Sequence, residues 1–369
     1  MENPDYIHQL NLFIEGVNNI PNLGENLRNS LAEQLRCHIK QRAAVNETIV
    51  SNPDVLKTQI SPVVIVGLHR SGTTMLHRLL SCDPRFVAPM AFELLQPCPP
   101  GRPENWQDTE RYRKAQEYMS HIYPGGLDNV DHMHEIKLDL PDECYFILQA
   151  CMFDNGWGST PPLRKLRHFV WNLPGDIEIK SFEYYKRALQ CIFYKGLKDG
   201  QTSLLKCPFH TLYLDTYKEV FPKAKFVIPF RNVKDIFGSM CSLSLQSGSV
   251  TRLETDKASA RDYCVDLFRT GSKRLIKAIK TMPKERFHLA SYAEMVKDPL
   301  AGVKEIYTHF GWDFTPEAED AMKRHIWENR QHKHGKHMYN LEDYGITEDD
   351  IKEITPEYLE YFDNQEKLL

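Results

Sequence analysis

The stretch PVVIVGLHRSGTTMLHRLL, residues 62–80, constrains the fold of this chain more than any other feature. An apolar run at 62–66 predicts a buried strand, which leads through a turn containing Gly67 and Gly72 into a helix. This order matches the G-x-x-x-x-G-K-[ST] phosphate loop, in which backbone N–H groups and a helix N-terminus hold phosphate oxygens. Thr73 stands where that motif places its lysine. The sequence therefore predicts an anion-binding loop without the lysine that reaches the β- and γ-phosphates.

Further strand candidates lie at residues 203–206, 225–230 and 287–291, with helical patterns at 212–221 and 300–310. The first two strands and the helix between them suit a right-handed βαβ unit on a parallel sheet. The helix after the loop should begin near Ser71 and bury Met75, Leu76, Leu79 and Leu80. We expect an α/β fold in which a phosphate-loop-type parallel sheet is flanked by helices.

The remaining segments are assigned within one domain spanning residues 1–369. Apolar positions at helical spacing predict a helical extension over residues 1–60, before a loop unit at 61–92. We expect a mainly helical insertion at 93–200, a sheet unit at 201–310, and a C-terminal segment with a basic loop and helices at 311–369.

Composition excludes several classes of protein. A formal net charge of −4 argues against a general nucleic-acid binder, so an anion site must be local. Nine cysteines without a C-x-x-C pair fit neither a disulfide framework nor a zinc site. The N-terminal residues do not resemble a signal peptide, and no apolar run approaches the roughly 18 to 20 residues of a membrane span. We expect a soluble cytoplasmic protein; its oligomeric state does not follow from the sequence.

A second motif, PFRNVKDIFGSM, places Arg231 at the end of a predicted strand and Ser239 eight residues later in the next helix. A guanidinium offers a fork of donors suited to phosphate, and a hydroxyl on nearly the same helix face adds a directional bond. Taken alone, the pair could equally be an ordinary strand-end arginine and helix serine.

Together, the loop and this spacing closely resemble the P-loop sulfotransferases, especially soluble bacterial-type enzymes whose loop reads P-R-S-G-T-T; here His69 replaces the proline. The resemblance covers roughly residues 60–345. It implies transfer of a sulfuryl group from 3′-phosphoadenosine 5′-phosphosulfate (PAPS) to a hydroxyl, release of adenosine 3′,5′-bisphosphate, and no metal. The donor-binding residues it implies are Arg70, Ser71, Gly72, Thr73, Thr74, Arg231, Ser239 and Tyr292, of which Arg70 is also expected to be catalytic.

Two further segments carry the resemblance. Lys206, in LLKCPFH, matches the K-x-P-F segment of tyrosylprotein sulfotransferases, whose lysine stabilises the transferred group and the leaving phosphate; a solvated surface lysine is the alternative. Tyr292, in SYAEMVKDP, matches the family's Y-x-x-[LM]-V-x-x-P segment, whose tyrosine lies near the adenine; a core tyrosine is the alternative.

Sulfuryl transfer to an alcohol needs a group that accepts the hydroxyl proton. Glu93 lies at about the offset from the loop at which tyrosylprotein sulfotransferases place their catalytic glutamate, and its apolar neighbours favour partial desolvation. The alternative is a surface glutamate that caps or solvates a loop. His134 is the rival base, as in histidine-based cytosolic sulfotransferases. The pair Glu135 and Glu143 accompanies it, His132 lies close by, and His210 beside Lys206 is a further possibility.

The acceptor is expected to be a small apolar, lipid- or sterol-like molecule, with residues 145–153 (YFILQACMF) as a pocket wall. In the basic stretch at 324–337, Lys333 or Lys336 is a further candidate for the 3′-phosphate. A nucleotide or small-molecule kinase is a weaker alternative, because Thr73 replaces the lysine. A non-catalytic nucleotide-binding protein would keep Arg231 but need no base.

Overall fold

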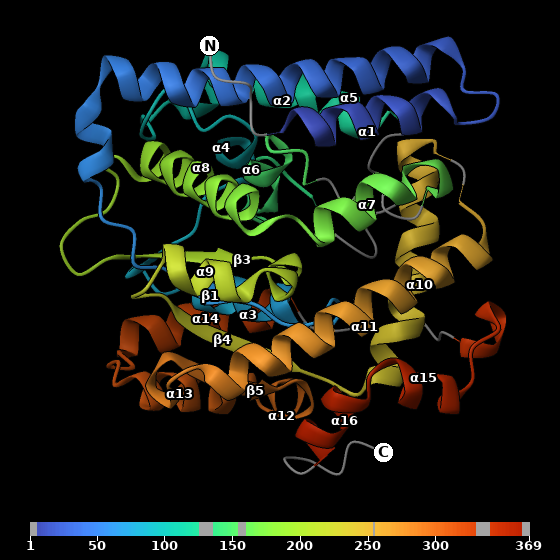
Figure 1. Cartoon of the computed structure of the whole chain (residues 1–369). Helices are drawn as coiled ribbons and strands as arrows, with labels where there is room; N and C mark the ends of the chain where they lie inside the picture. The colour runs from blue at the N-terminus through green and yellow to red at the C-terminus, as the bar shows by residue number, and fades with distance from the viewer. Residues whose placement is uncertain (1–5, 125–135, 154–159, 254, 330–339, 364–369) are drawn as a thin grey trace. The chain divides into compact units, whose positions relative to one another are not determined.

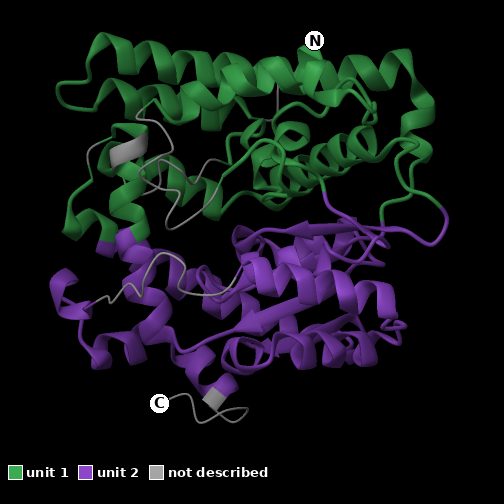
Figure 2. Ribbon diagram, turned by 180° about the vertical axis from the view of Figure 1, so that it is seen from behind, with its two compact units in different colours: residues 1–60, 89–198, 243–260 green, residues 61–88, 199–242, 261–369 purple. Residues whose placement is uncertain are grey.

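The computed structural model describes residues 6–124, 136–153, 160–253, 255–329 and 340–363. The chain forms two compact units, each built from three separate segments (Figure 2). Unit 1 contains Met1–Ile60, Pro89–Lys198 and Leu243–Ala260, and unit 2 contains Ser61–Ala88, Asp199–Ser242 and Arg261–Leu369.

Figure 1 labels the elements in chain order. The strands are β1 (Val63–Ile65), β2 (Phe86–Val87), β3 (Thr202–Lys206), β4 (Lys225–Phe230) and β5 (Phe287–Ser291). The α-helices are α1 (Ile7–Asn18), α2 (Glu25–Ser51), α3 (Thr73–Leu80), α4 (Ala91–Leu95), α5 (Glu110–Ile122), α6 (Tyr145–Gln149), α7 (Arg164–Trp171), α8 (Gly175–Phe193), α9 (Leu214–Val220), α10 (Val233–Thr251), α11 (Lys257–Thr281), α12 (Tyr292–Lys297), α13 (Pro299–Phe310), α14 (Pro316–Glu328), α15 (Glu348–Ile354) and α16 (Pro356–Asp363). Short 3₁₀ helices are η1 (Pro53–Lys57), η2 (Trp106–Asp108), η3 (Pro161–Leu163), η4 (Pro208–Leu212), η5 (Lys284–Arg286) and η6 (Leu341–Tyr344).

The sheet lies in unit 2 and is parallel throughout, with strand order β2-β3-β1-β4-β5. The four strands predicted from the sequence are confirmed to within a residue at either end. Two features differ from the prediction. The two-residue strand β2 extends the sheet at one edge, and β3 and β4 each pair with β1 rather than with each other.

Side chains that follow one another along a strand point to opposite faces of the sheet, and helices of unit 2 cover both faces. Val63, Ile65 and Val227 pack into a core with residues of α3, α13 and α14, including the predicted stripe of Leu76, Leu79 and Leu80, with Met75 partly buried beside it. Phe226 alternates with Val227, so its ring points to the opposite face, where it meets Tyr217 of α9. Figure 1 shows α13 and α14 on one side of the strands and α9 on the other.

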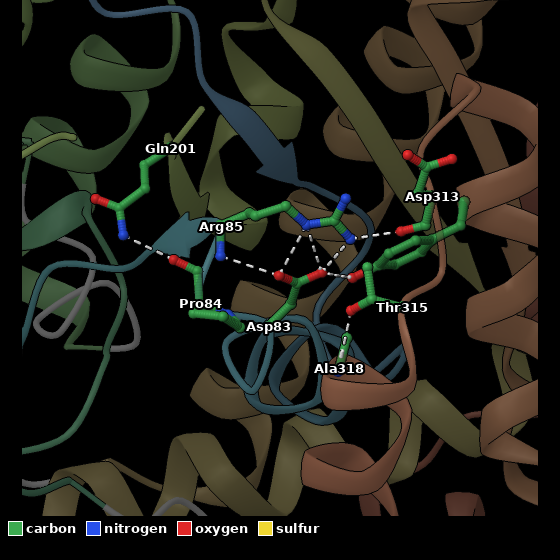
Figure 3. Close-up of polar contacts among 8 residues, drawn as sticks. Asp83, Pro84, Arg85, Gln201, Asp313, Thr315 and Ala318 are labelled. Carbon is green, nitrogen blue, oxygen red and sulfur yellow. Dashed lines mark hydrogen bonds and ion pairs between the residues drawn. The ribbon is translucent and has the colours of Figure 1, made fainter. Parts of the chain in front are cut away.

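A hydrogen-bond network around Asp83, here called the polar brace, holds the segment that follows α3 (Figure 3). The buried Asp83 accepts hydrogen bonds from the Arg85 guanidinium and, at 2.6 Å, from the Tyr307 hydroxyl of α13. Arg85 Nη2 also donates to the Asp313 carbonyl, and the Arg85 carbonyl accepts from Thr202 N–H at the start of β3. Burial alone would raise the pKa of Asp83, but the hydrogen bonds from Arg85 and Tyr307 outweigh it and hold that pKa below its usual range.

Unit 1 is helical in its described residues. Helices α1 and α2 confirm the predicted N-terminal helices; α2 packs along α5, and α1 packs along α7 (Figure 1). The predicted insertion at 93–200 contributes α5 to α8 and most of α4 to this unit. Across the described ranges, no helix combines the length and apolar character needed to cross a membrane.

Candidate functional site

The loop between β1 and α3 is shaped by two glycines and one strained arginine. A Cβ on Gly67 would lie 2.5 Å from the Pro229 carbonyl oxygen, so only glycine fits where β1 leaves the sheet. Arg70 and Gly72 both have left-handed backbone, with φ of 67° and 99°. The two positions form a tight turn that ends at the N-terminus of α3, where the helix dipole favours an anion.

The hydroxyl groups in this loop have different environments. Ser71 donates its hydroxyl at 2.6 Å and its backbone N–H at 3.2 Å to the Leu68 carbonyl, so it holds the turn itself. Thr73, at the first position of α3, is buried, and Thr74 is half-buried. The loop is therefore preformed by its own contacts.

The loop arginine joins the two residues of the second motif. Arg70 Nε donates to Ser239 Oγ at 3.0 Å, and Arg231 Nη1 donates to the Arg70 carbonyl at 3.3 Å. Arg231 directly follows β4, and Ser239 lies in α10. The structure thus brings together three predicted site residues, with Arg70 as the link between the other two.

Arg231 has further partners that sequence reasoning missed. Its Nη2 donates to Asp235 at 3.4 Å, one helical turn later, a spacing that could have been recognised from the sequence. Its backbone N–H donates to the Tyr358 hydroxyl at 3.1 Å, and that hydroxyl donates to the Arg231 carbonyl at 3.2 Å. Tyr358 lies 127 residues away in α16, and no sequence pattern connects it to Arg231. Within the described ranges, Arg231 Nε is buried without a hydrogen-bond partner.

Lys206 lies at the same end of the sheet as the loop. Its Cα is paired with Ile65, the last residue of β1, so the two strands end side by side. The side chain is only 1% exposed, which contradicts the alternative of a solvated surface lysine. Three residues on, Phe209 packs edge-to-face against His69 at 4.2 Å, so the segment after β3 is packed on the loop. His210 is buried against Tyr217, 4.8 Å between ring centres.

Glu93 lies in unit 1, at the third position of α4. Its side chain is 1% exposed, so it is not a surface glutamate, although it does cap the helix: Oε2 accepts the Met90 N–H at 2.9 Å. Arg102 donates Nε to Oε1 at 3.0 Å and Nη2 to Oε2. Glu93 also interacts electrostatically with the buried Arg111. Burial lowers the pKa of Arg111, and the negative charge of Glu93 opposes that decrease. The carboxylate is thus desolvated and firmly held.

Several predicted residues lie outside the described ranges: His132, His134, Glu135, Lys333 and Lys336. Glu143 is buried, and its N–H donates to Asp142 at 2.6 Å. The apolar run at 145–153 begins with α6 and is buried except at Tyr145. In the part of the chain that the structure describes, no three His, Cys, Asp or Glu side chains are grouped as a metal site would require.

A parallel sheet with a glycine turn, a helix N-terminus, two arginines and a buried lysine at its carboxyl end defines a phosphate-loop group-transfer enzyme. The chain belongs to the sulfotransferase family, whose model matches residues 62–316. It is therefore a sulfotransferase, and PAPS is in general the co-substrate of that family.

Mycobacterial sulfotransferases are among its relatives. The omega-hydroxy-beta-dihydromenaquinone-9 sulfotransferase Stf3 of Mycobacterium tuberculosis is 24% identical over 328 residues, covering 85% of this chain and 77% of the relative, and the Mycobacterium bovis protein matches equally. The crystal structure of sulfotransferase STF9 from Mycobacterium avium superposes with a TM-score of 0.83 at 25% identity, covering 98% of this chain and 92% of that one. Sulfotransferase STF1 from Mycobacterium tuberculosis H37Rv shares the fold, with a TM-score of 0.78 at 24% identity over 95% and 92% of the two chains.

Proposed function

We propose that this sulfotransferase transfers the sulfuryl group of PAPS to the hydroxyl of a small apolar acceptor. The observation that carries the proposal is the meeting of Arg70, Arg231 and Ser239 beside a glycine turn that begins a helix. The Arg231 guanidinium and the Ser239 hydroxyl suit the 3′-phosphate, which distinguishes this donor from ATP. The turn and the start of α3 suit the 5′-phosphosulfate. Thr73 leaves the loop without the lysine that grips a triphosphate.

Each residue then has a defined task in the transfer. The donor supplies the sulfuryl group; the acceptor oxygen forms a bond to sulfur as the bond from sulfur to the phosphate oxygen breaks. Lys206 and Arg70 stabilise the negative charge that develops on the leaving phosphate. Glu93 takes the hydroxyl proton, so adenosine 3′,5′-bisphosphate leaves and the acceptor becomes a sulfate ester. His134, in this scheme, helps to orient the hydroxyl.

We infer the class of acceptor from the apolar character of the predicted pocket wall at residues 145–153. The run at 145–153 contains no charged residue and is buried except at Tyr145; as the wall of a pocket it favours a lipid- or sterol-like alcohol over a sugar. The name of the relative Stf3 specifies an omega-hydroxylated dihydromenaquinone as its acceptor. That example supports the class of acceptor and not its identity.

The test is incubation with an apolar alcohol panel and either PAPS labelled in the sulfuryl group, ATP labelled in the γ-phosphate, or no donor. Labelled donors are needed because sulfated and phosphorylated products have nearly the same mass. Label transferred from PAPS, with release of adenosine 3′,5′-bisphosphate, supports the proposal. Label transferred only from ATP would favour the kinase alternative, and nucleotide binding without transfer across the panel would favour the non-catalytic one.

A further inference from the structure

The register of the sheet places Tyr292 beside Arg231. Phe230, the last residue of β4, is paired with Ser291, the last residue of β5. Arg231 and Tyr292 are the next residues along their chains, so they leave neighbouring strands at the same level. Since β1 is the other neighbour of β4, the loop that carries Gly72 also begins at this edge.

The Tyr292 ring is packed between this arginine and the loop. The Arg231 guanidinium carbon lies 4.2 Å from the centre of the ring, within the range of a strong cation–π contact. A Cβ built on Gly72 would lie 2.6 Å from Tyr292 Cδ2 and 3.1 Å from Cε2, so the ring edge fills the space that a side chain would need. In the described residues the Tyr292 hydroxyl makes no hydrogen bond. Both contacts described here are made by the ring.

The other contacts of the Arg231 guanidinium are long. Nη1 reaches the Arg70 carbonyl at 3.3 Å, and Nη2 reaches Asp235 at 3.4 Å. The Asp235 side chain is 58% exposed, and a solvated pair one helical turn apart holds a side chain weakly. Without the ring, the hydrogen bonds of the guanidinium to the described residues would be only these two long ones. The face of Tyr292 is what fixes the plane of the guanidinium.

We propose that Tyr292 is a positioning residue, which holds the Arg231 guanidinium in place for the 3′-phosphate through its ring face. This assignment rests on the proposed function and differs from the sequence prediction that Tyr292 contacts the adenine. It requires an aromatic ring at position 292 but no hydroxyl. Through Arg231 it ties the residue to the 3′-phosphate, because adenosine 5′-phosphate does not use Arg231 in this scheme.

The experiment compares Tyr292→Leu with Tyr292→Phe, measuring the affinity for adenosine 3′,5′-bisphosphate and for adenosine 5′-phosphate by calorimetry. Tyr194→Leu is the matched control: Tyr194 is also half-buried, and Lys195 Nζ lies 5.1 Å from the centre of its ring, but it belongs to unit 1. Thermal unfolding is recorded for each variant. Steady-state rates with PAPS then separate KM from kcat.

We expect Tyr292→Leu to weaken bisphosphate binding about tenfold, within the range of one partly buried cation–π contact, and to weaken adenosine 5′-phosphate binding by less than about twofold, because leucine still covers Gly72. KM for PAPS should rise by a similar factor, with kcat within about twofold. Tyr292→Phe and Tyr194→Leu should match the wild type. Equal weakening of both nucleotides in Tyr292→Leu, or a Tyr292→Phe variant as weak as the leucine, would overturn the proposal. A wild-type protein that does not prefer the bisphosphate would overturn the proposed function itself.

Discussion

Replacing Glu93 by Gln tests whether this carboxylate is a base or only a structural partner. The side chain is 1% exposed and accepts hydrogen bonds from Met90 N–H and from two nitrogens of Arg102. Gln keeps the size and an acceptor oxygen but removes the charge. Hydrogen bonds to a charged group contribute about 1.5 to 3 kcal/mol and neutral ones about 0.5 to 1.5 kcal/mol. We therefore expect a loss of about 1 to 3 kcal/mol of stability, with the fold retained.

The effect on turnover should be much larger than this structural disturbance explains. Loss of a general base lowers the rate by about 10²- to 10⁴-fold. Arg102→Gln is the matched control, because it breaks the same ion pair from the other side and leaves the carboxylate and its bond to Met90 in place. That variant should lose more stability, because it leaves a buried carboxylate without its ion pair, but keep turnover within about tenfold of wild type. His134→Ala should mainly raise KM for the acceptor.

The assay is the initial rate of transfer from labelled PAPS at saturating donor, with thermal unfolding and bisphosphate binding measured on the same preparations. If Arg102→Gln loses as much turnover as Glu93→Gln, the role of Glu93 is structural and the base assignment is refuted. If Glu93→Gln turns over normally while His134→Ala is inactive, the histidine is the base. The donor-site assignments depend on other residues and would stand in both cases.

Three other predictions concern residues of unit 2. Arg231→Ala should weaken adenosine 3′,5′-bisphosphate binding at least about tenfold and leave adenosine 5′-phosphate binding nearly unchanged, as calorimetry will show, because one or more charged hydrogen bonds are lost. Lys206→Met keeps most of the buried volume but removes the charge; turnover should fall about 10²-fold with nucleotide binding retained, and near-normal rates would remove Lys206 from the mechanism. For Asp83, whose pKa is lowered in the folded protein, the stabilisation should be fully present above its unfolded pKa of about 3.9 and lost as the pH falls through the lowered value. Asp83→Asn should therefore unfold at a lower temperature than wild type at pH 7, and this difference should shrink below about pH 4; a difference independent of pH would contradict the role of the charge.

The sheet could be predicted from the sequence wherever a strand carried its own pattern. The apolar runs of β1, β3, β4 and β5 are each bounded by a turn or a polar residue, and their positions were confirmed. The strand β2 could not be recognised, because two residues are too few to show alternation. It is held by pairing of Phe86 with Thr202 and by the brace around Asp83, which depends on Tyr307 more than two hundred residues later.

The same distinction applies to the candidate site. Arg231 and Ser239 could be paired in advance because a strand end and two turns of helix fix their separation locally. The position of Arg70 between them depends on its left-handed backbone conformation, which is unusual for a residue other than glycine. No local sequence pattern predicts that conformation. The partner of Glu93 was equally hidden: Arg102 reaches it across an irregular segment, where side-chain directions do not follow a period.

The missing lysine of the phosphate loop now has a physical explanation. Thr73 is buried at the first position of α3, so a lysine there would need a triphosphate to receive its charge. In this chain other residues place positive charge at the same carboxyl end of the sheet. Arg70 supplies it from within the loop, and Lys206 supplies it from the end of β3, paired with Ile65 at the end of β1. In the proposed scheme, the reacting group of the donor is bonded to the 5′-phosphate, so cations are needed at the start of the loop rather than beyond it. This scheme would account for a chain that keeps the turn but not the lysine.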